Sequence, residues 1–242
     1  MQISQEAKDI MKIFTKKIIS DWTVFDVSWS VFFILLTLIV GFQSHNTIIE
    51  ILSGIAGMLN VFLCAKGKVY NFYFGIFFNA TYAFIALSQH YYASFILYLV
   101  YFLPMQFIGL YLWGRNRRKR EDSNESIEMK RMSLKMKFIW ALVCVLGVVS
   151  VAYILKKMGD PMPTSDSATN ILTVIGIVMM VKRYAEQWHL WNISNVFGIL
   201  LWLPFFSHQG NLPVSQLIMS IAFLVTSIYG TLYWMSHSKK NV

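Results

Sequence analysis

Charged side chains are scarce in this sequence. They make up 14% of its 242 residues, whereas soluble globular domains carry roughly 25%. Hydrophobic residues reach 56%, and the mean hydropathy is +0.52. The shortage of charge is concentrated in several apolar runs of about 17–22 residues, the length at which a helix crosses a bilayer. The composition therefore argues against an ordinary soluble domain and predicts an all-α polytopic membrane protein.

Catalytic and metal-binding patterns are also missing. Cys64 and Cys144 lie in different apolar runs, without a CxxC motif or a Cys/His cluster, so neither a disulfide framework nor a metal site is predicted. The chain has no GxxxxGK[ST] motif, and no Ser/His/Asp set or carboxylate pair suited to hydrolysis or group transfer is recognisable. We therefore expect no enzyme and no resident cofactor.

Acidic residues lie outside the apolar runs or at their edges, with Glu50 and Glu186 the closest to the membrane. Ion- or proton-coupled transporters normally keep an Asp, Glu or His at membrane depth. His189 is the one histidine expected inside a helix, and a boundary residue with a local hydrogen bond is the simpler interpretation of it. The pattern argues against active coupling.

Eight transmembrane helices are predicted to within a few residues. They cover residues 29–43, 47–65, 69–88, 92–113, 136–155, 168–184, 187–206 and 213–235. The first 28 residues lack the apolar core and cleavage site of a signal peptide. Ile10, Met11, Phe14 and Ile18 share one face of a predicted amphipathic helix on the membrane surface.

The net charge of +9 follows from membrane topology. With the N-terminus in the cytoplasm, nineteen of the 21 Lys and Arg residues lie on the cytoplasmic side, and only Lys156 and Lys157 lie outside. This asymmetry is the positive-inside pattern. We therefore expect both termini in the cytoplasm and no nucleic-acid partner. The basic run at 115–120 additionally favours contact with anionic membrane lipids.

An internal repeat is visible where two spans end, at Gly109-Leu-Tyr-Leu-Trp113 and Gly230-Thr-Leu-Tyr-Trp234. Counting back from these endings, spans two to four correspond to spans six to eight. The single span between them restores the orientation, which predicts parallel triple-helix repeats with a site at their interface. The predicted domains are 1–46 (surface segment and extra first helix), 47–113 (first unit), 114–167 (basic loop, linker helix and outer loop), 168–236 (second unit) and 237–242 (tail).

Polar but uncharged residues are the candidates for that site. Trp188, Trp191, Asn192 and Asn195 fall on one face of a predicted helix. Unpaired amides in hydrocarbon cost several kcal/mol, so this face should meet protein, water or a polar ligand. Flat aromatic rings beside amides suit a flat ring that also forms hydrogen bonds. Further candidates are Tyr73 and Asn79 in the third span and Tyr98, Phe102 and Gln106 in the fourth.

Simpler interpretations of these residues stay open. Asn192, Asn195 and Gln106 are equally suited to hydrogen bonds between helices. For Trp113 and Trp234, at predicted membrane edges, packing or an interfacial aromatic belt is the favoured interpretation.

The motif Trp188-x-x-Trp191-x-x-x-Asn195 and the paired Gly-x-x-x-Trp endings resemble the PnuC family of bacterial nicotinamide riboside transporters, over residues 47–236. The resemblance implies a 3+1+3 helix arrangement related to the SWEET sugar carriers but inverted in the membrane, with the first span as an extra helix. It also implies a homotrimer in the bacterial inner membrane. Transport would be facilitated diffusion of nicotinamide riboside, an NAD precursor, made net-inward by intracellular phosphorylation. Sister families carry thiamine or riboflavin, which stay as alternatives.

On this resemblance, aromatic side chains would stack on the pyridinium ring and attract its charge, while amides would bind the carboxamide and the ribose hydroxyls. The expected ring contacts are Trp188 and Trp191 with either Phe102 or Tyr98, and the expected amides are Asn192, Asn195, Gln106 and Asn79. A phosphate dianion would meet no buried Arg or Lys, which is costly. We therefore expect the mononucleotide to be rejected.

Two functions of other classes remain open at this stage. A membrane enzyme acting on a lipid or nucleoside would need a buried acid, base or metal ligand. A scaffold protein would use the amide face only to pack helices. The substitution Asn195→Leu separates the scaffold from the transporter: a scaffold would lose its fold or oligomer, and a transporter would lose transport while keeping its assembly.

Overall fold

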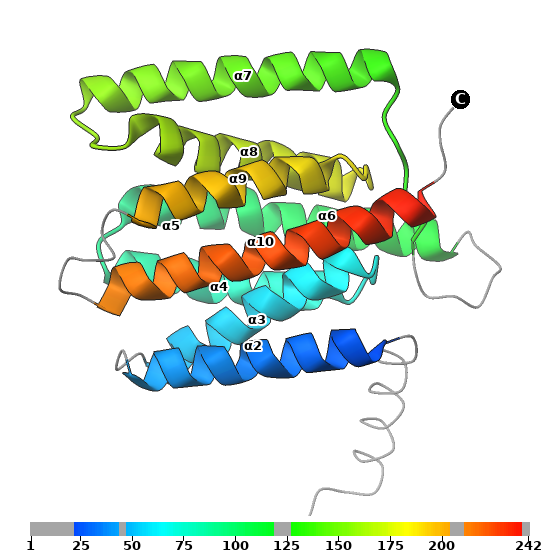
Figure 1. Cartoon of the computed structure of the whole chain (residues 1–242), viewed down its shortest axis with the longest axis horizontal. Helices are drawn as coiled ribbons and strands as arrows, with labels where there is room; N and C mark the ends of the chain where they lie inside the picture. Colours follow the sequence, from blue (N-terminus) through cyan, green and yellow to red (C-terminus); the bar gives the residue numbers. More distant parts are fainter. Residues whose placement is uncertain (1–21, 44–46, 119–126, 204–210, 239–242) are drawn as a thin grey trace, which may run out of the picture.

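The computed structural model describes residues 22–43, 47–118, 127–203 and 211–238, which form helices and short connections. The elements are α2 (Val24–Gln43), α3 (Ile48–Ala65), α4 (Asn71–Ser88), α5 (Tyr92–Leu97), η1 (Tyr98–Phe102), α6 (Leu103–Arg118), α7 (Leu134–Lys157), α8 (Pro163–Val181), α9 (Gln187–Trp202) and α10 (Asn211–His237) (Figure 1). Because α5, η1 and α6 follow one another without a break, the described chain forms eight helical rods, each overlapping a predicted span. The surface helix predicted over residues 10–18 lies outside the described residues.

Five of these rods are long and apolar enough to cross a membrane by length and composition. The five segments are Asp26–Gln43, Ile48–Ala65, Ser94–Arg117, Leu134–Lys157 and Pro163–Val181. The ends of several rods follow from local sequence. Thr47 caps α3 in a capping box with Glu50, an arrangement that satisfies two otherwise unpaired donors, and Ser133 caps α7.

Six rods form a closed ring in which each contacts the next. The contacts run from α3 to α4, α6, α8, α9 and α10, and from α10 back to α3. The other two lie at opposite edges of the bundle, α2 against α3 and α7 against α8 (Figure 1). Below, α3, α4, α5, η1 and α6 are called the first group, and α8, α9 and α10 the second group.

The turns that follow α3 and α8 have the same backbone geometry. Gly67 and Arg183 occupy corresponding places and have φ angles of 65° and 67°. In each turn, this residue donates its N–H to the carbonyl three residues earlier, and the next residue donates to the carbonyl five residues earlier, at 2.8–2.9 Å. This is a helix C-terminal motif that requires the left-handed conformation.

Two tryptophans link the groups reciprocally next to these turns. Trp113 at the end of α6 donates its Nε1–H to the carbonyl of Met180 on α8 at 3.0 Å, and Trp234 on α10 donates to the carbonyl of Ala65 on α3 at 3.0 Å. Both side chains are fully buried. Of the interpretations left open for them, the structure therefore supports packing.

An ion pair is buried at the start of α2, where the sequence argument expected ionisable groups to stay at the membrane edge. Helix α2 begins earlier than predicted, so Asp26 lies in its first turn and is fully buried. Its carboxylate contacts Lys66 Nζ at 2.7 Å and accepts a hydrogen bond from Tyr229 Oη at 2.8 Å. The pair joins the extra helix to both groups.

Candidate functional site

A cavity of about 320 Å³ lies at the centre of the ring, within the size range of small-molecule sites. Its lining comes from both groups, through α3, α4, η1, α6, α8, α9 and α10. Within the described part of the chain, no acidic or basic side chain lines it. The cavity is therefore a neutral compartment between the two groups.

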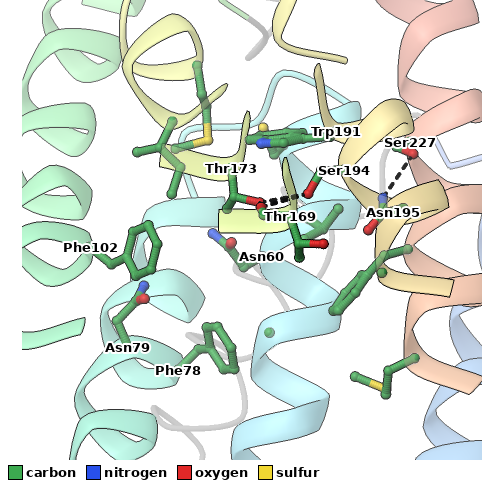
Figure 2. Close-up of a pocket in the computed structure, with 18 of the residues that line it drawn as sticks. Asn60, Phe78, Asn79, Phe102, Thr169, Thr173, Trp191, Ser194, Asn195 and Ser227 are labelled. Carbon is green, nitrogen blue, oxygen red and sulfur yellow. Dashed lines mark hydrogen bonds between the residues drawn. The ribbon is translucent and has the colours of Figure 1, made fainter. Parts of the chain in front are cut away.

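The first group supplies carboxamides and aromatic rings. Asn60 on α3 donates its Nδ2–H to the carbonyl of Asn71 at 2.9 Å, and Asn79 on α4 donates to the carbonyl of Gly75 at 2.6 Å. The Oε1 atom of Gln106 on α6 is buried without a hydrogen-bond partner among the described residues. Figure 2 shows the side chains of Asn79 and Phe102 on one side of the cavity.

The π-helical segment η1 contributes two of the aromatic rings. Tyr98 and Phe102 both line the cavity, with ring centroids 4.8 Å apart in an edge-to-face contact. Tyr82 stacks on Tyr98 at 4.2 Å. A π-helical turn widens the backbone locally and is often found at functional sites. Here it joins α5 to α6 at the level of the cavity, and the predicted face of Tyr98, Phe102 and Gln106 still meets the cavity.

The second group supplies an indole ring, one carboxamide and several hydroxyls. Trp191 and Asn195 line the cavity from α9, and Asn195 donates its Nδ2–H to Ser227 Oγ on α10 at 3.3 Å. The hydroxyls of Thr173 on α8 and Ser194 on α9 lie 3.0 Å apart. Figure 2 shows these two contacts as dashed lines, opposite Asn79 and Phe102.

Six of the nine predicted site residues line this cavity: Asn79, Tyr98, Phe102, Gln106, Trp191 and Asn195. The other three, Tyr73, Trp188 and Asn192, lie elsewhere in the described structure, which corrects the prediction that they face the ligand.

Trp188 and Asn192 are displaced from the cavity because the polar face of α9 divides. At 100° per residue, the pair Trp188 and Asn192 lies about 60° around the helix from the pair Trp191 and Asn195. Trp188 is fully buried, and its ring lies against Gly230 of α10, 2.5 Å from where a methyl group on that glycine would be. Asn192 donates to Thr231 Oγ1 at 2.8 Å and accepts from Ser227 Oγ at 2.6 Å. Asn192 therefore forms the interhelical hydrogen bonds that were the alternative interpretation.

Tyr73 lies on the outer side of α4. Its side chain is 55% exposed and stacks on Tyr70 with ring centroids 6.4 Å apart. Tyr73 was predicted because it is close in sequence to the other candidates of this helix. The side of α4 that faces the centre of the helix bundle instead carries Gly75 and Asn79, which are buried.

Asn60, Thr173 and Ser194 line the cavity and were not predicted. Asn60 carried a usable signal, since it is a carboxamide inside the apolar run 48–65 and the desolvation argument made for Asn195 applies to it equally. Thr173 and Ser194 carried little signal, because hydroxyls in membrane helices usually bond to their own backbone. Thr173 does so with the carbonyl of Thr169 at 2.7 Å.

The amides of the cavity keep hydrogen-bond donors as well as acceptors for a ligand, because Asn79 and Asn195 each donate one of their two N–H groups to a described residue and Gln106 donates none. The amide nitrogens of Asn60, Asn79 and Asn195 each donate to the protein. Their Oδ1 atoms accept no hydrogen bond from any described residue, and none of these atoms is among the fully buried unpaired atoms. A neutral cavity with aromatic rings and amides suits a flat ligand that carries positive charge together with hydrogen-bond donors and acceptors.

Comparison with known proteins gives one consistent result. The family described as nicotinamide mononucleotide transporter matches residues 47–236. The chain is 31% identical to the nicotinamide riboside transporter PnuC of Haemophilus influenzae, over 93% of this chain and 96% of that protein. It is 28% identical to the protein of the same name from Neisseria mucosa, over 93% and 86%. A crystal structure described as the vitamin B3 transporter PnuC is similar with a TM-score of 0.74 and 26% identity, covering 93% of this chain and 98% of that chain.

Proposed function

This chain belongs to the nicotinamide mononucleotide transporter family, which contains the PnuC proteins and is a transporter family rather than an enzyme family, and from that premise we propose that it carries nicotinamide riboside across the bacterial inner membrane. The observation that supports this substrate is the neutral cavity, lined by aromatic rings and amides. Trp191 and Phe102 would hold the pyridinium ring by stacking and cation–π attraction, each contact contributing about 0.5–2 kcal/mol. The free amide oxygens would accept hydrogen bonds from the ligand.

Nicotinamide riboside fits the cavity better than its 5′-phosphate. No Lys or Arg is among the described residues that line the cavity, so a phosphate dianion would be desolvated there without a counter-charge. Although the family description names the mononucleotide, this lining favours the riboside, the compound in the names of the PnuC relatives.

The proposed transport mode is facilitated diffusion, made net-inward by phosphorylation of the riboside in the cytoplasm. The cavity has no charged described residue that would bind a coupling ion or proton. Neither Asp26 nor Lys66, which form the buried ion pair, lines the cavity. The pair is satisfied by mutual contact, so it is assigned a structural role.

The two groups are proposed to be parallel triple-helix units that rock about the cavity, with α7 as the linker helix, α2 as the extra helix and both termini in the cytoplasm. The reciprocal indole hydrogen bonds of Trp113 and Trp234 between the two groups support this 3+1+3 arrangement, and the family resemblance supports a homotrimer and a relation to the SWEET carriers. Six predicted residues keep their proposed role in ligand binding. Trp188 is assigned to packing, Asn192 to hydrogen bonds between helices, and Tyr73 to the outer surface of α4.

Counterflow in proteoliposomes tests this proposal. Vesicles loaded with unlabelled nicotinamide riboside should accumulate labelled riboside without an ion gradient or ATP. External thiamine or riboflavin should compete poorly, and the mononucleotide should not compete. Counterflow with thiamine or riboflavin in place of the riboside would show that the protein transports that vitamin instead. A requirement for a proton or sodium gradient would overturn facilitated diffusion.

A further inference from the structure

Two buried glycines support the cavity side chains from behind. Gly176 on α8 lies directly under the indole of Trp191, whose Cδ1 is 2.8 Å from where a methyl group on Gly176 would be, with Nε1 closer still. Gly176 itself does not line the cavity, whereas Trp191 does. The indole therefore lies between this glycine and the cavity, and a side chain at position 176 would push the ring into the cavity.

The first group has a corresponding arrangement with different chemistry. Gly75 on α4 is buried beneath two amides: a methyl group there would lie 2.6 Å from Asn60 Nδ2 and would overlap the carboxamide of Gln106. Asn60 and Gln106 line the cavity, and Gly75 does not. Here the missing side chain lets two carboxamides, rather than an indole, lie close to the helix backbone.

Each glycine in one group corresponds, by its position along the helix, to a large side chain in the other group. Asn60 and Gly176 each lie five residues before the last residue of their helix, α3 or α8. Gly75 and Trp191 are each the fifth residue of the following helix, α4 or α9. At corresponding positions, one group therefore has a large side chain where the other has glycine. The indole of Trp191 therefore lies on one side of the cavity, and the amides of Asn60 and Gln106 lie on the other.

We propose that Gly176 and Gly75 are positioning residues that fix the orientation of the ligand, an inference that rests on the proposed function. Gly176 holds Trp191 in place for the pyridinium ring. Gly75 holds Gln106 where it receives the ligand's carboxamide. Gln106 makes no hydrogen bond to any described residue, and its Oε1 is buried. Two primary amides have complementary donors and acceptors, so the nicotinamide carboxamide is the group that satisfies Gln106.

Glycine-to-alanine variants test this assignment by calorimetry in detergent. Gly176→Ala should weaken riboside binding at least tenfold, because the indole is displaced into the cavity. Gly75→Ala should have a similar effect through the amides. Gly114→Ala is the matched control, since nothing lies within 4 Å of a methyl group at this α6 position, and it should bind as the wild type does.

A second ligand distinguishes the effects of the two glycines. Pyridinium riboside, which lacks the carboxamide, should bind the wild type more weakly than nicotinamide riboside. Gly176→Ala should weaken binding of both ligands by similar factors. Gly75→Ala should weaken nicotinamide riboside but leave pyridinium riboside nearly unchanged. Equal losses for both ligands in both variants would overturn the assigned orientation.

A combined variant distinguishes positioning from a general packing defect. Phenylalanine is smaller than tryptophan, so Gly176→Ala combined with Trp191→Phe should recover at least threefold in riboside affinity over Gly176→Ala alone. Independent, additive losses would show that Gly176 acts through something other than Trp191. Fluorine NMR of 5-fluorotryptophan protein gives a ligand-free readout: the Trp191 signal should move in Gly176→Ala and stay in place in Gly114→Ala. An unchanged chemical shift of the Trp191 signal in Gly176→Ala would contradict the inference even if that variant bound the riboside more weakly.

These outcomes distinguish the inference from the proposed function. If the wild type binds riboside and Gly176→Ala binds it equally well, only the positioning role fails. If the wild type binds no riboside, the proposed function fails first, and the orientation fails with it.

Discussion

The two helical groups are alike at the end where their paired turns lie and unlike at the cavity. At that end, both have the same turn hydrogen bonds and a buried tryptophan that donates to the other group. In both, an aromatic ring also fills the space beside a glycine, Phe72 at Gly109 and Trp188 at Gly230. At the cavity, the first group presents three carboxamides with phenylalanine and tyrosine rings, and the second presents an indole, one carboxamide and several hydroxyls. The features that the two groups share therefore serve the packing between them, and the features that differ are those available for ligand binding.

A second difference concerns the lysine that ends the first helix of each group. Lys66 caps α3 and is buried against Asp26 of the extra helix. Lys182 caps α8 and is exposed. Helix α2 therefore modifies one group only, and it does so through a buried charge pair that depends on both partners.

The largest expected effect on stability comes from removing the charge of Lys66, the buried lysine. Lys66→Met would leave Asp26 buried without its cation, which costs about 3–5 kcal/mol. The melting temperature in detergent should fall by about 10 °C, given roughly 2–4 °C per kcal/mol for a chain of this size. Lys182→Met should change it little, because that side chain is exposed. Similar melting temperatures for the two variants would contradict the asymmetry.

The next effect tests the likeness of the two ends. Trp113→Phe and Trp234→Phe each remove one indole N–H bonded to the other group and leave a small gap. Each should destabilise the protein by about 2 kcal/mol, from a lost hydrogen bond and reduced packing. Thermal unfolding of the two single variants measures this. A loss confined to one variant would show that the reciprocal bonds are unequal.

The smallest expected effect separates two asparagines on one helix. Asn195→Leu should weaken riboside binding about tenfold, equivalent to one hydrogen bond of about 1.4 kcal/mol, and should leave assembly intact. Asn192→Leu should mainly lower stability, because Asn192 bonds to Thr231 and Ser227 of α10. Calorimetry and size-exclusion chromatography of both variants report on this. Loss of the oligomer in Asn195→Leu would favour the scaffold interpretation.

The helices were predictable because apolar runs of membrane-spanning length leave few alternatives. The cavity was predictable in part. The desolvation argument pointed to Gln106 and to the polar face of α9, and Gln106, Trp191 and Asn195 line the cavity. Periodicity could not separate Trp191 and Asn195 from Trp188 and Asn192, which lie about 60° away on the same helix.

Other features depended on tertiary contacts that the sequence does not display. Asp26 appeared to lie outside the membrane, because its partner Lys66 is 40 positions away. The roles of Gly75 and Gly176 depend on side chains from neighbouring helices. An isolated glycine in an apolar helix gives no indication of which side chain will cover it.

The most direct test of the account is calorimetric titration of the purified wild-type protein with nicotinamide riboside, nicotinamide mononucleotide and thiamine. Because the lining contains aromatic rings and amides without a charged described residue, the account predicts riboside binding, with the mononucleotide at least tenfold weaker and thiamine weaker than the riboside. Binding of the mononucleotide as tight as that of the riboside would contradict the central claim that a neutral cavity lined by aromatic rings and amides selects the ligand.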